Sequence, residues 1–435
     1  MRLQQSLCVL TVVLVFFASQ IAVAQYTVLH DFTGGADGAY PRGGLTIDIA
    51  GNLYGTTDQG GNTGGNCSGN GFSGCGTVFE VLPNGALLTL YTFTGGNDGA
   101  HGDGRPVLGP DGSLYGHTSG GGAFGFGNVF KMTPTRLCIS LACPQIHLVW
   151  KQSPIYQFTD GIRISFFGPS ADLVFDPVGN IYGARFNGGL QNPGVCNFGG
   201  CGYVYKLTRS GETWTESDVY EFTGDSGDGL GPSGLTLRPD GNLYGVTLYG
   251  GDLNCIPPEG CGTVFQLKLS GDTWIETPLH SFEDDAGGTQ PWGSPVFDAA
   301  GNFYSTTTNL DVACCSSFFK LTLSGNGWGF SNELMLTQTR PGPFASLTMD
   351  KAGNLYGTTF GGGTGCGTVF ELTPSGNGWS YKDLHDFVSG PFCNNGQDGA
   401  FPLSEVTIDA KGNLYGTTSG GGKFGYGVVW KLTPQ

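Results

Sequence analysis

The sequence predicts an all-β protein built from seven tandem repeats, and three observations support this prediction. The 435 residues include 79 glycines and 12% aromatic residues, but only 12% charged residues. Beyond the first 24 residues, no long segment places its apolar residues at the i, i+3, i+4 spacing of a helix. A short Gly-Asn-Leu-Tyr motif recurs instead at steps of 52 to 67 residues. Recurrence on this scale indicates that each copy is one supersecondary unit.

The first element is an N-terminal leader. Arg2 supplies a positive charge, residues 7–17 are apolar, and Ala22-Val23-Ala24 is a small-residue cleavage site. This pattern predicts a signal peptide over residues 1–24, with Gln25 as the first residue of the mature chain. An uncleaved membrane anchor is the alternative, but the apolar run is short for a membrane span. We therefore expect a secreted or periplasmic protein without membrane insertion after signal cleavage, and one domain over residues 25–435.

Each repeat contains four strand-like runs. In the first repeat, residues 44–48 read "GLTID", residues 52–57 read "NLYGTT" and residues 76–81 read "GTVFEV", and a fourth run has the form "LYTF". Alternating apolar and polar residues are typical of strands, and the "D-x-x-G-N" segments between the first two runs favour hairpin turns. Four short antiparallel strands, repeated around a ring, describe the blades of a β-propeller. The seven motifs begin at Gly51, Gly112, Gly179, Gly241, Gly301, Gly353 and Gly412.

The two ends of the chain predict how the ring closes. The seventh unit stops after its third strand, at "VVWKLTPQ", while residues 26–32, "YTVLHDF", form a spare fourth strand at the start. Pairing that strand into the last blade removes an exposed sheet edge. The sequence therefore predicts a seven-bladed β-propeller with four antiparallel strands per blade, in which the N-terminal strand closes the last blade.

The combined motif also carries a family resemblance. Units of the form "GLTxDxxGNLYGTTxxGGxxGxGTVFxLTP", followed by "FTGGxDGAxP", cover essentially the whole mature chain. They resemble the GloVer (Gloeobacter–Verrucomicrobium) repeats of exported bacterial proteins. The resemblance implies an exported repeat protein and says almost nothing about a ligand.

Charge and cysteine content restrict the partners and the compartment. Removal of the leader leaves 18 Lys and Arg against 35 Asp and Glu, a formal net charge of −17. An acidic chain is a poor ligand for nucleic acid. Twelve cysteines remain, and in an exported protein their expected state is the disulfide. The expected pairs bracket loops or insertions: Cys67 with Cys75, Cys138 with Cys143, Cys196 with Cys201, Cys255 with Cys261, and Cys366 with Cys393. The partners of Cys314 and Cys315 stay open, and no C-x₂-C zinc pattern is present.

Candidate ligand-binding residues lie on the predicted long loops, which share one end of a propeller. Repeat-related aspartates there suggest two interpretations, a Ca²⁺-binding or cation-steering ring or simple turn chemistry beside glycine, and we favour the turns. They are Asp37, Asp98, Asp160, Asp228, Asp284 and Asp398. We also expect exposed aromatic residues on these loops as stacking surfaces for sugars, with loop packing as the alternative. They are Tyr40, Phe72, Phe124, Phe126, Phe198, Trp292, Phe424 and Tyr426.

No catalytic set emerges from the sequence. His30, His280 and His385 share a repeat position with tyrosines, which favours ring packing over catalysis, and no nucleophile elbow is present. We expect no cofactor and a monomer. The sequence favours a non-enzymatic binding module for a glycan or a protein at the cell envelope. The alternatives are a propeller hydrolase or lyase acting on envelope polysaccharide, which needs paired carboxylates in the funnel, and a purely structural surface protein.

Overall fold

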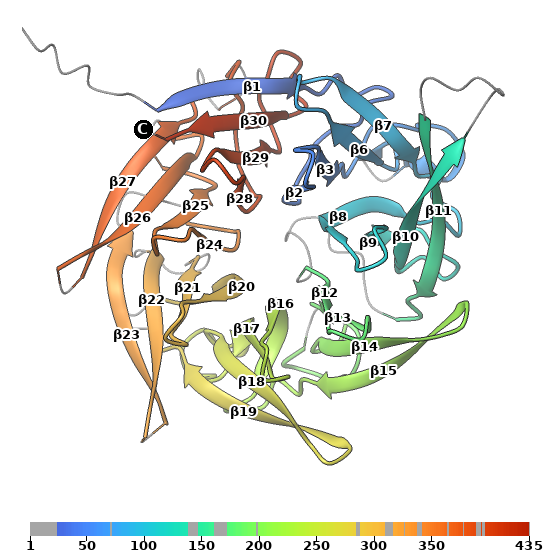
Figure 1. Ribbon diagram of the computed structural model, residues 1–435. Helices are drawn as coiled ribbons and strands as arrows, with labels where there is room; N and C mark the ends of the chain where they lie inside the picture. Colours follow the sequence, from blue (N-terminus) through green and yellow to red (C-terminus); the bar gives the residue numbers. More distant parts are fainter. Residues whose placement is uncertain are drawn as a thin grey trace, which may run out of the picture.

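Seven four-stranded antiparallel sheets surround a central axis in the computed structural model (Figure 1). This arrangement confirms the predicted seven-bladed β-propeller. The structure describes residues 24–69, 72–137, 147–160, 172–196, 199–283, 288–308, 316–325, 327–336, 342–362, 365–376, 378–388, 393 and 396–434. Over these ranges, no helix has the length and apolar character needed to cross a membrane. The predicted signal peptide lies outside them, except for Ala24.

The strands of each blade are given in order from the strand nearest the axis outward. Blade 1 contains β2 (Thr46–Ile47), β3 (Leu53–Thr56), β6 (Thr77–Val81) and β7 (Leu87–Thr92). Blade 2 contains β8 (Ala100–Leu108), β9 (Leu114–Gly120), β10 (Asn128–Leu137) and β11 (His147–Gln157). Blade 3 contains β12 (Val174–Phe175), β13 (Ile181–Arg185), β14 (Tyr203–Ser210) and β15 (Thr213–Glu221). The loop after β3 adds a 3₁₀ turn (Gly65–Cys67) and a small ribbon of β4 (Ser68–Gly69) and β5 (Phe72–Ser73).

The remaining blades follow the same order. Blade 4 contains β16 (Gly229–Leu237), β17 (Leu243–Gly250), β18 (Thr263–Ser270) and β19 (Thr273–Ser281). Blade 5 contains β20 (Pro291–Phe297), β21 (Phe303–Thr307), β22 (Ser316–Ser324) and β23 (Gly327–Leu336). Blade 6 contains β24 (Thr348–Met349), β25 (Leu355–Thr359), β26 (Thr368–Ser375) and β27 (Gly378–Asp386). Blade 7 contains β28 (Thr407–Ile408), β29 (Leu414–Thr418), β30 (Val428–Thr433) and, from the other end of the chain, β1 (Gln25–Asp31).

Strand β1 closes the ring as the sequence predicts. It pairs antiparallel with β30, with Tyr26 opposite Leu432 and Val28 opposite Trp430. The Tyr26 ring also stacks on His385 of blade 6, with ring centroids 3.8 Å apart. The closing strand is therefore fixed both by its ladder and by packing against the preceding blade.

The opening motif is a turn and a strand. In blade 1, a carboxylate oxygen of Asp48 accepts hydrogen bonds from the Ala50 and Asn52 backbone N–H groups, at 2.9 and 2.8 Å. The other oxygen accepts from the Asn52 amide and from the Tyr54 hydroxyl. The residue after Tyr54 is Gly55, because a Cβ atom at this position would lie 2.3 Å from the Phe79 ring. Aspartate, asparagine, tyrosine and glycine thus recur because every blade needs the same turn.

Threonines of the motif join neighbouring blades. Thr417 Oγ1 of blade 7 donates to the Gly43 carbonyl before blade 1, at 3.1 Å, and Thr56 Oγ1 donates to Gly104 of blade 2, also at 3.1 Å. The next threonine serves its own blade, because Thr57 Oγ1 accepts from the Thr77 backbone N–H at 2.9 Å. The repeated "TT" therefore holds one sheet together and attaches it to the next.

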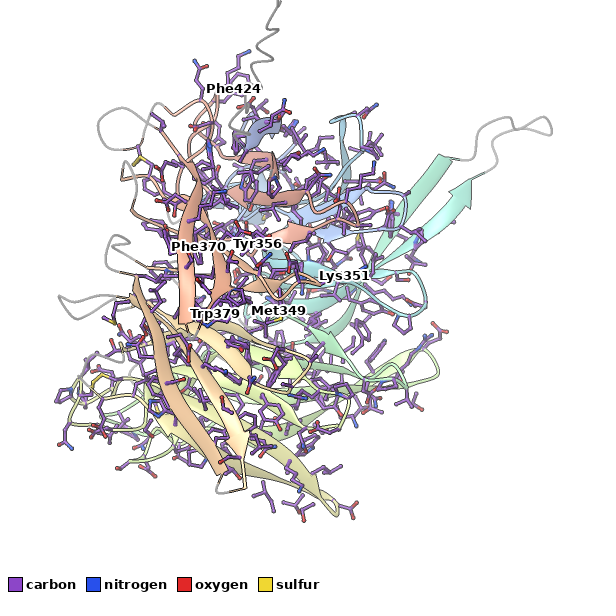
Figure 2. All side chains as sticks on the ribbon, turned by 60° about the vertical axis from the view of Figure 1, so that its left-hand side comes forward. Met349, Lys351, Tyr356, Phe370, Trp379 and Phe424 are labelled. Atoms are coloured by element: carbon purple, nitrogen blue, oxygen red, sulfur yellow. A yellow bond between two sulfur atoms is a disulfide. The ribbon has the colours of Figure 1, made fainter. Side chains whose placement is uncertain are left out.

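The hydrophobic core lies between adjacent blades. One of its clusters joins blade 5 to blade 6 through the buried residues Tyr304, Phe318, Leu355 and Phe370, with Trp379 packed against them. Figure 2 shows Phe370, Met349 and Trp379 gathered in this region, whereas Phe424 lies at an edge of the molecule. Each blade is too thin to bury its own apolar surface, so its stability depends on both neighbours.

Four of the five predicted disulfides are present. They join Cys67 to Cys75, Cys196 to Cys201, Cys255 to Cys261, and Cys366 to Cys393. The predicted partners Cys138 and Cys143 lie outside the described residues, as do Cys314 and Cys315. Three of the four bonds close the loop between the second and third strands of a blade. The fourth ties that loop of blade 6 to the segment leading into blade 7.

Candidate functional site

The aspartates of the long loops bind groups of their own loops. The Asp37 carboxylate accepts from the Thr33 backbone N–H at 2.9 Å and contacts His30 Nε2 at 3.0 Å. Asp98 and Asp228 accept in the same way from Thr94 and Thr223, each at 2.8 Å. Burial opposes ionisation of Asp37, but the hydrogen bonds from Thr33 and His30 outweigh it and lower the pKa. These contacts are those of loop-forming residues.

Asp398 follows the same plan, accepting from the Val388 backbone N–H at 3.2 Å and contacting His385 Nε2 at 3.1 Å. Asp160 accepts from the Gly189 N–H at 2.7 Å, and Asp284 lies outside the described residues. No group of three or more potential metal ligands occurs among the residues that the structure describes. Cation or ligand binding by this ring stays a prediction.

Five of the predicted aromatic residues divide into three groups, and Phe198 lies outside the described residues. Phe124 and Phe424 are exposed, with 58% and 47% of their surface accessible. Tyr40 and Tyr426 pack edge to face, 5.6 Å apart, where blade 7 meets blade 1. Trp292 is only 3% accessible, so the expectation of an exposed ring is wrong. It belongs to the innermost strand β20 rather than to a loop, and it packs against Phe344.

The innermost segments of the blades converge on a small cavity on the propeller axis, which we call the central funnel. Its volume is about 30 Å³, which accommodates a water molecule or two but no sugar ring. Residues of six blades line it. They are Arg42, Gly44, Asp172, Ser233, Trp292, Gly293, Ser294, Phe344, Ala345, Ser346, Leu403 and Glu405.

A cluster of charged residues of blades 1 and 2 surrounds Arg42, which lines the funnel. Asp58 is buried and contacts Arg42 at 3.5 Å and His101 Nδ1 at 3.1 Å. Burial opposes its ionisation, but the hydrogen bond from His101 and the Arg42 charge lower its pKa. Asp103 lies near the same carboxylate, and burial together with the Asp58 charge raises its pKa to about 7. Two neighbouring carboxyl groups therefore differ in protonation near neutral pH.

A second group of charged residues joins blades 2, 3 and 7. Arg105 Nε of blade 2 lies 3.2 Å from Asp172 Oδ2 of blade 3 and 2.7 Å from Glu405 Oε1 of blade 7. Burial raises the pKa of Glu405, and the neighbouring Asp172 raises it further against the effect of Arg105. One guanidinium group thus holds two carboxyl groups close together. The three residues therefore link three blades to one another.

Two further polar residues replace motif threonines near these charged residues. His117 is buried, and burial lowers its pKa to about 4, so the ring is neutral at physiological pH. Its Nε2 has no hydrogen-bond partner among the residues that the structure describes. Arg185 donates to the backbone carbonyls of Phe126 and Asp160, at 3.0 and 3.1 Å, and lies 4.1 Å from the Phe158 ring centroid.

Aromatic residues of blades 5 and 6 also line the funnel. Trp292 of blade 5 packs edge-on against Phe344, with centroids 6.0 Å apart, and Phe344 packs against Phe360 at 5.7 Å. Phe360 then stacks on Phe401 of blade 7 at 4.8 Å. Phe401 lies two residues before Leu403, which lines the funnel, in the segment that leads from the long loop into blade 7. Blades 5 to 7 therefore contribute a row of rings, of which Trp292 and Phe344 line the funnel together with Arg42 and Asp172.

Sequence reasoning overlooked the charged cluster, although a signal was present. Asp103 and Arg105 stand where blade 1 has Arg42 and Gly44, and Glu405 stands where blade 6 has Ser346. A comparison of the seven units position by position marks these residues as charged departures from the repeat. Residues that keep the repeat pattern build the blades, whereas charged residues that depart from it form the central cluster.

Comparison with known families agrees with the repeat structure. A family model described as the Gloeobacter/Verrucomicrobia repeat matches residues 15–142, 151–326 and 296–435. The chain belongs to this repeat family. In this member, the Gloeobacter/Verrucomicrobia repeats are propeller blades. No curated protein has a sequence that matches this chain.

Several solved structures are similar to this chain. The extracellular domain of a putative hybrid two-component system from B. thetaiotaomicron is 13% identical, with a TM-score of 0.50, and the match covers 95% of this chain and 42% of that one. PorZ, a surface component of the type-IX secretion system of Porphyromonas gingivalis, is 13% identical, with a TM-score of 0.45 and coverage of 91% and 46%. A putative 6-phosphogluconolactonase from Bacteroides uniformis is 14% identical, with a TM-score of 0.44 and coverage of 80% and 85%. At such identities the likeness shows the fold alone, and the chain spans under half of the first two proteins.

Proposed function

We propose that this protein is an exported binding module that holds a glycan at the mouth of the central funnel. The observation that carries the proposal is the row Phe344–Phe360–Phe401, which packs on the buried Trp292 and begins at the cavity that Arg42 and Glu405 also line. Aromatic rings pack against the apolar C–H face of a sugar, while carboxylate and guanidinium groups hydrogen-bond its hydroxyls. Because the cavity on the axis is small, the ligand rests at the mouth and does not enter the channel.

Export is part of the same proposal. Residues 1–24 have the pattern of a signal peptide, and the four disulfides suit an oxidising compartment. A cell-envelope polysaccharide is then the available glycan, and an envelope protein is the other partner consistent with a propeller face.

A polysaccharide array tests the proposal, followed by calorimetry of each ligand that binds. We expect Phe360→Ala and Phe401→Ala each to weaken binding about fivefold, since ring stacking contributes on the order of 1 kcal/mol per ring. Leu323→Ala is the control, because this exposed side chain lies on the outer hairpin of blade 5, outside the row, and its loss should leave the affinity unchanged. Absence of binding across the array would remove the glycan proposal and favour the structural role.

A second candidate function is a hydrolase or lyase acting on envelope polysaccharide. The pair Asp58 and Asp103 favours it, because one carboxyl group is ionised while the pKa of the other is about 7, as general acid catalysis requires. Product detection on the same array separates the two functions. An enzyme should lose turnover in Asp103→Asn and keep its ligand affinity, whereas a binding module shows no product in either form.

A further inference from the structure

A repeated aromatic contact seals five of the seven boundaries between blades. At each of them the tyrosine of the opening motif packs edge-on against a tryptophan from the outer hairpin of the next blade, with centroids 5.6 to 6.3 Å apart. The pairs are Tyr54–Trp150, Tyr115–Trp214, Tyr182–Trp274, Tyr244–Trp328 and Tyr304–Trp379. At the sixth boundary, Tyr356 belongs to a core cluster against which Tyr26 of β1 packs.

The seventh boundary, between blades 7 and 1, lacks this tryptophan. The outer hairpin of blade 1 turns at residues 82–86, directly after the pair Val81–Leu87, whereas in blade 6 the ladder continues past Leu372–Tyr381 to Pro374–Trp379. Tyr415 is accordingly only partly buried, while the six equivalent tyrosines are at most 6% accessible. The shortened hairpin leaves a groove of about 560 Å³ at the short-turn end, opposite the long loops.

The groove combines apolar walls with two free cations. Ile47, Leu53, Leu82 and Pro83 of blade 1 face Leu29, Ile408 and Tyr415 of blade 7 across it. Asp48 and Asp409 also line it, but each is saturated by two backbone N–H groups, an asparagine amide and a tyrosine hydroxyl. Lys431 lies 5.8 Å from the Tyr415 ring centroid and Lys411 is exposed at the rim. In the described part of the chain, neither lysine forms an ion pair.

We propose that this groove binds a tryptophan side chain that carries a neighbouring carboxylate, as in an acidic, tryptophan-containing segment of a partner protein. The indole takes the place that Trp379 and its equivalents fill at the other boundaries, edge-on to Tyr415. The carboxylate pairs with Lys411 and Lys431, the two basic residues that line the groove. Its volume lies within the range of typical ligand sites. The site is separate from the funnel, so it stands or falls independently of glycan binding.

The test titrates the purified protein with N-acetyl-L-tryptophan and with its neutral amide, followed by NMR. We expect saturable binding of the acid, and at least fivefold weaker binding of the amide. Lys411→Gln combined with Lys431→Gln should bring the affinity for the acid down to that for the amide. Lys206→Gln is the matched control, because Lys206 lies over Tyr182 at a boundary that Trp274 already fills. It should leave both affinities unchanged.

A hairpin exchange supplies the decisive variant. Replacing residues 82–86 by residues 373–380 gives blade 1 the hairpin that carries Trp379 in blade 6, so that the chain fills its own groove. We expect this variant to lose binding of both probes and to melt no lower than the wild type. If it fails to fold, the lysine pair still decides. Absence of saturable binding by the wild type, equal affinity for acid and amide, or undiminished binding after the exchange would each overturn the proposal.

Discussion

The backbone N–H of His101 donates a 2.7 Å hydrogen bond to the carbonyl oxygen of Cys75 and thereby ties blade 2 to the disulfide-closed loop of blade 1. The same bond recurs at three other boundaries, from Gly231 to Cys201, from Gln290 to Cys261 and from Phe401 to Cys366. Each disulfide therefore fixes a cysteine whose carbonyl oxygen accepts a hydrogen bond from the next blade. The bonds hold adjacent blades in place as well as their own loops.

The disulfides should differ in their contribution to stability. Cys196 and Cys201 are 5 residues apart, whereas Cys366 and Cys393 are 27 apart. Because a longer closed loop restricts the unfolded chain more, replacing the first pair by serine should cost about 2 kcal/mol and the second about 3.5 kcal/mol. Urea denaturation of the two double variants measures both values. The reverse order would contradict the loop-entropy explanation.

The closing strand should stabilise the whole ring. Tyr26 stacks on His385, donates its hydroxyl to the Asp398 carbonyl and packs among the core residues of blade 7. We expect Tyr26→Ala to cost about 3 kcal/mol through lost packing, and Tyr26→Phe about 1 kcal/mol through the lost hydrogen bond. Deleting residues 26–32 exposes the edge of β30 and should lower the melting temperature much more. An unchanged melting temperature after the deletion is incompatible with closure by β1.

Two equivalent threonines provide a matched test of the bonds between blades. Thr417 Oγ1 donates to the Gly43 carbonyl, whereas the buried Thr306 Oγ1 has no hydrogen-bond partner among the described residues. Thr417→Val should therefore cost about 1 kcal/mol, and Thr306→Val should be neutral or stabilising, because it removes an unsatisfied buried hydroxyl. Thermal denaturation of the two variants compares them directly, and equal destabilisation would argue against this bond as a source of stability.

Asp103 should make stability depend on pH. Its pKa of about 7 in the folded protein exceeds the ordinary value of 3.8, so the folded state binds this proton more tightly than the unfolded state. The contribution of Asp103 is fully present below pH 4 and is lost as the pH rises toward 7, by at most about 1.4 kcal/mol per pH unit. Asp103→Asn mimics the protonated form and should gain stability relative to the wild type over this window. If the difference in stability between the variant and the wild type did not change from pH 4 to 7, protonation of Asp103 would not explain it.

Much of the scaffold could be predicted from the sequence because each blade solves the same problem with the same residues. The Asp48–Asn52–Tyr54 turn and the pairing of Cys366 with Cys393 are local or repeat-related features, visible without coordinates. The closing strand was also predictable, because a spare strand at one end complements an incomplete unit at the other.

The central cluster was not predictable in the same way. Arg105 and Glu405 are 300 residues apart, and their contact exists only because seven blades of fixed width bring blades 2 and 7 to a common axis. Repeat comparison marks each residue as unusual but does not give its partner. Trp292 shows the complementary failure, because an aromatic residue near a glycine-rich loop was expected to be exposed, whereas the innermost strand directs it against Phe344.

The pairing of β1 with β30 also imposes an order on folding. Gln25 lies opposite Thr433, so the first strand to leave the ribosome finds its partner only after nearly all of the chain has been made. Contacts so distant in sequence form slowly, and until they form both β1 and β30 present unpaired edges to other chains. Once they have formed, the ring has no free end from which blades can peel away one by one. The strand that makes folding slow should also make unfolding slow.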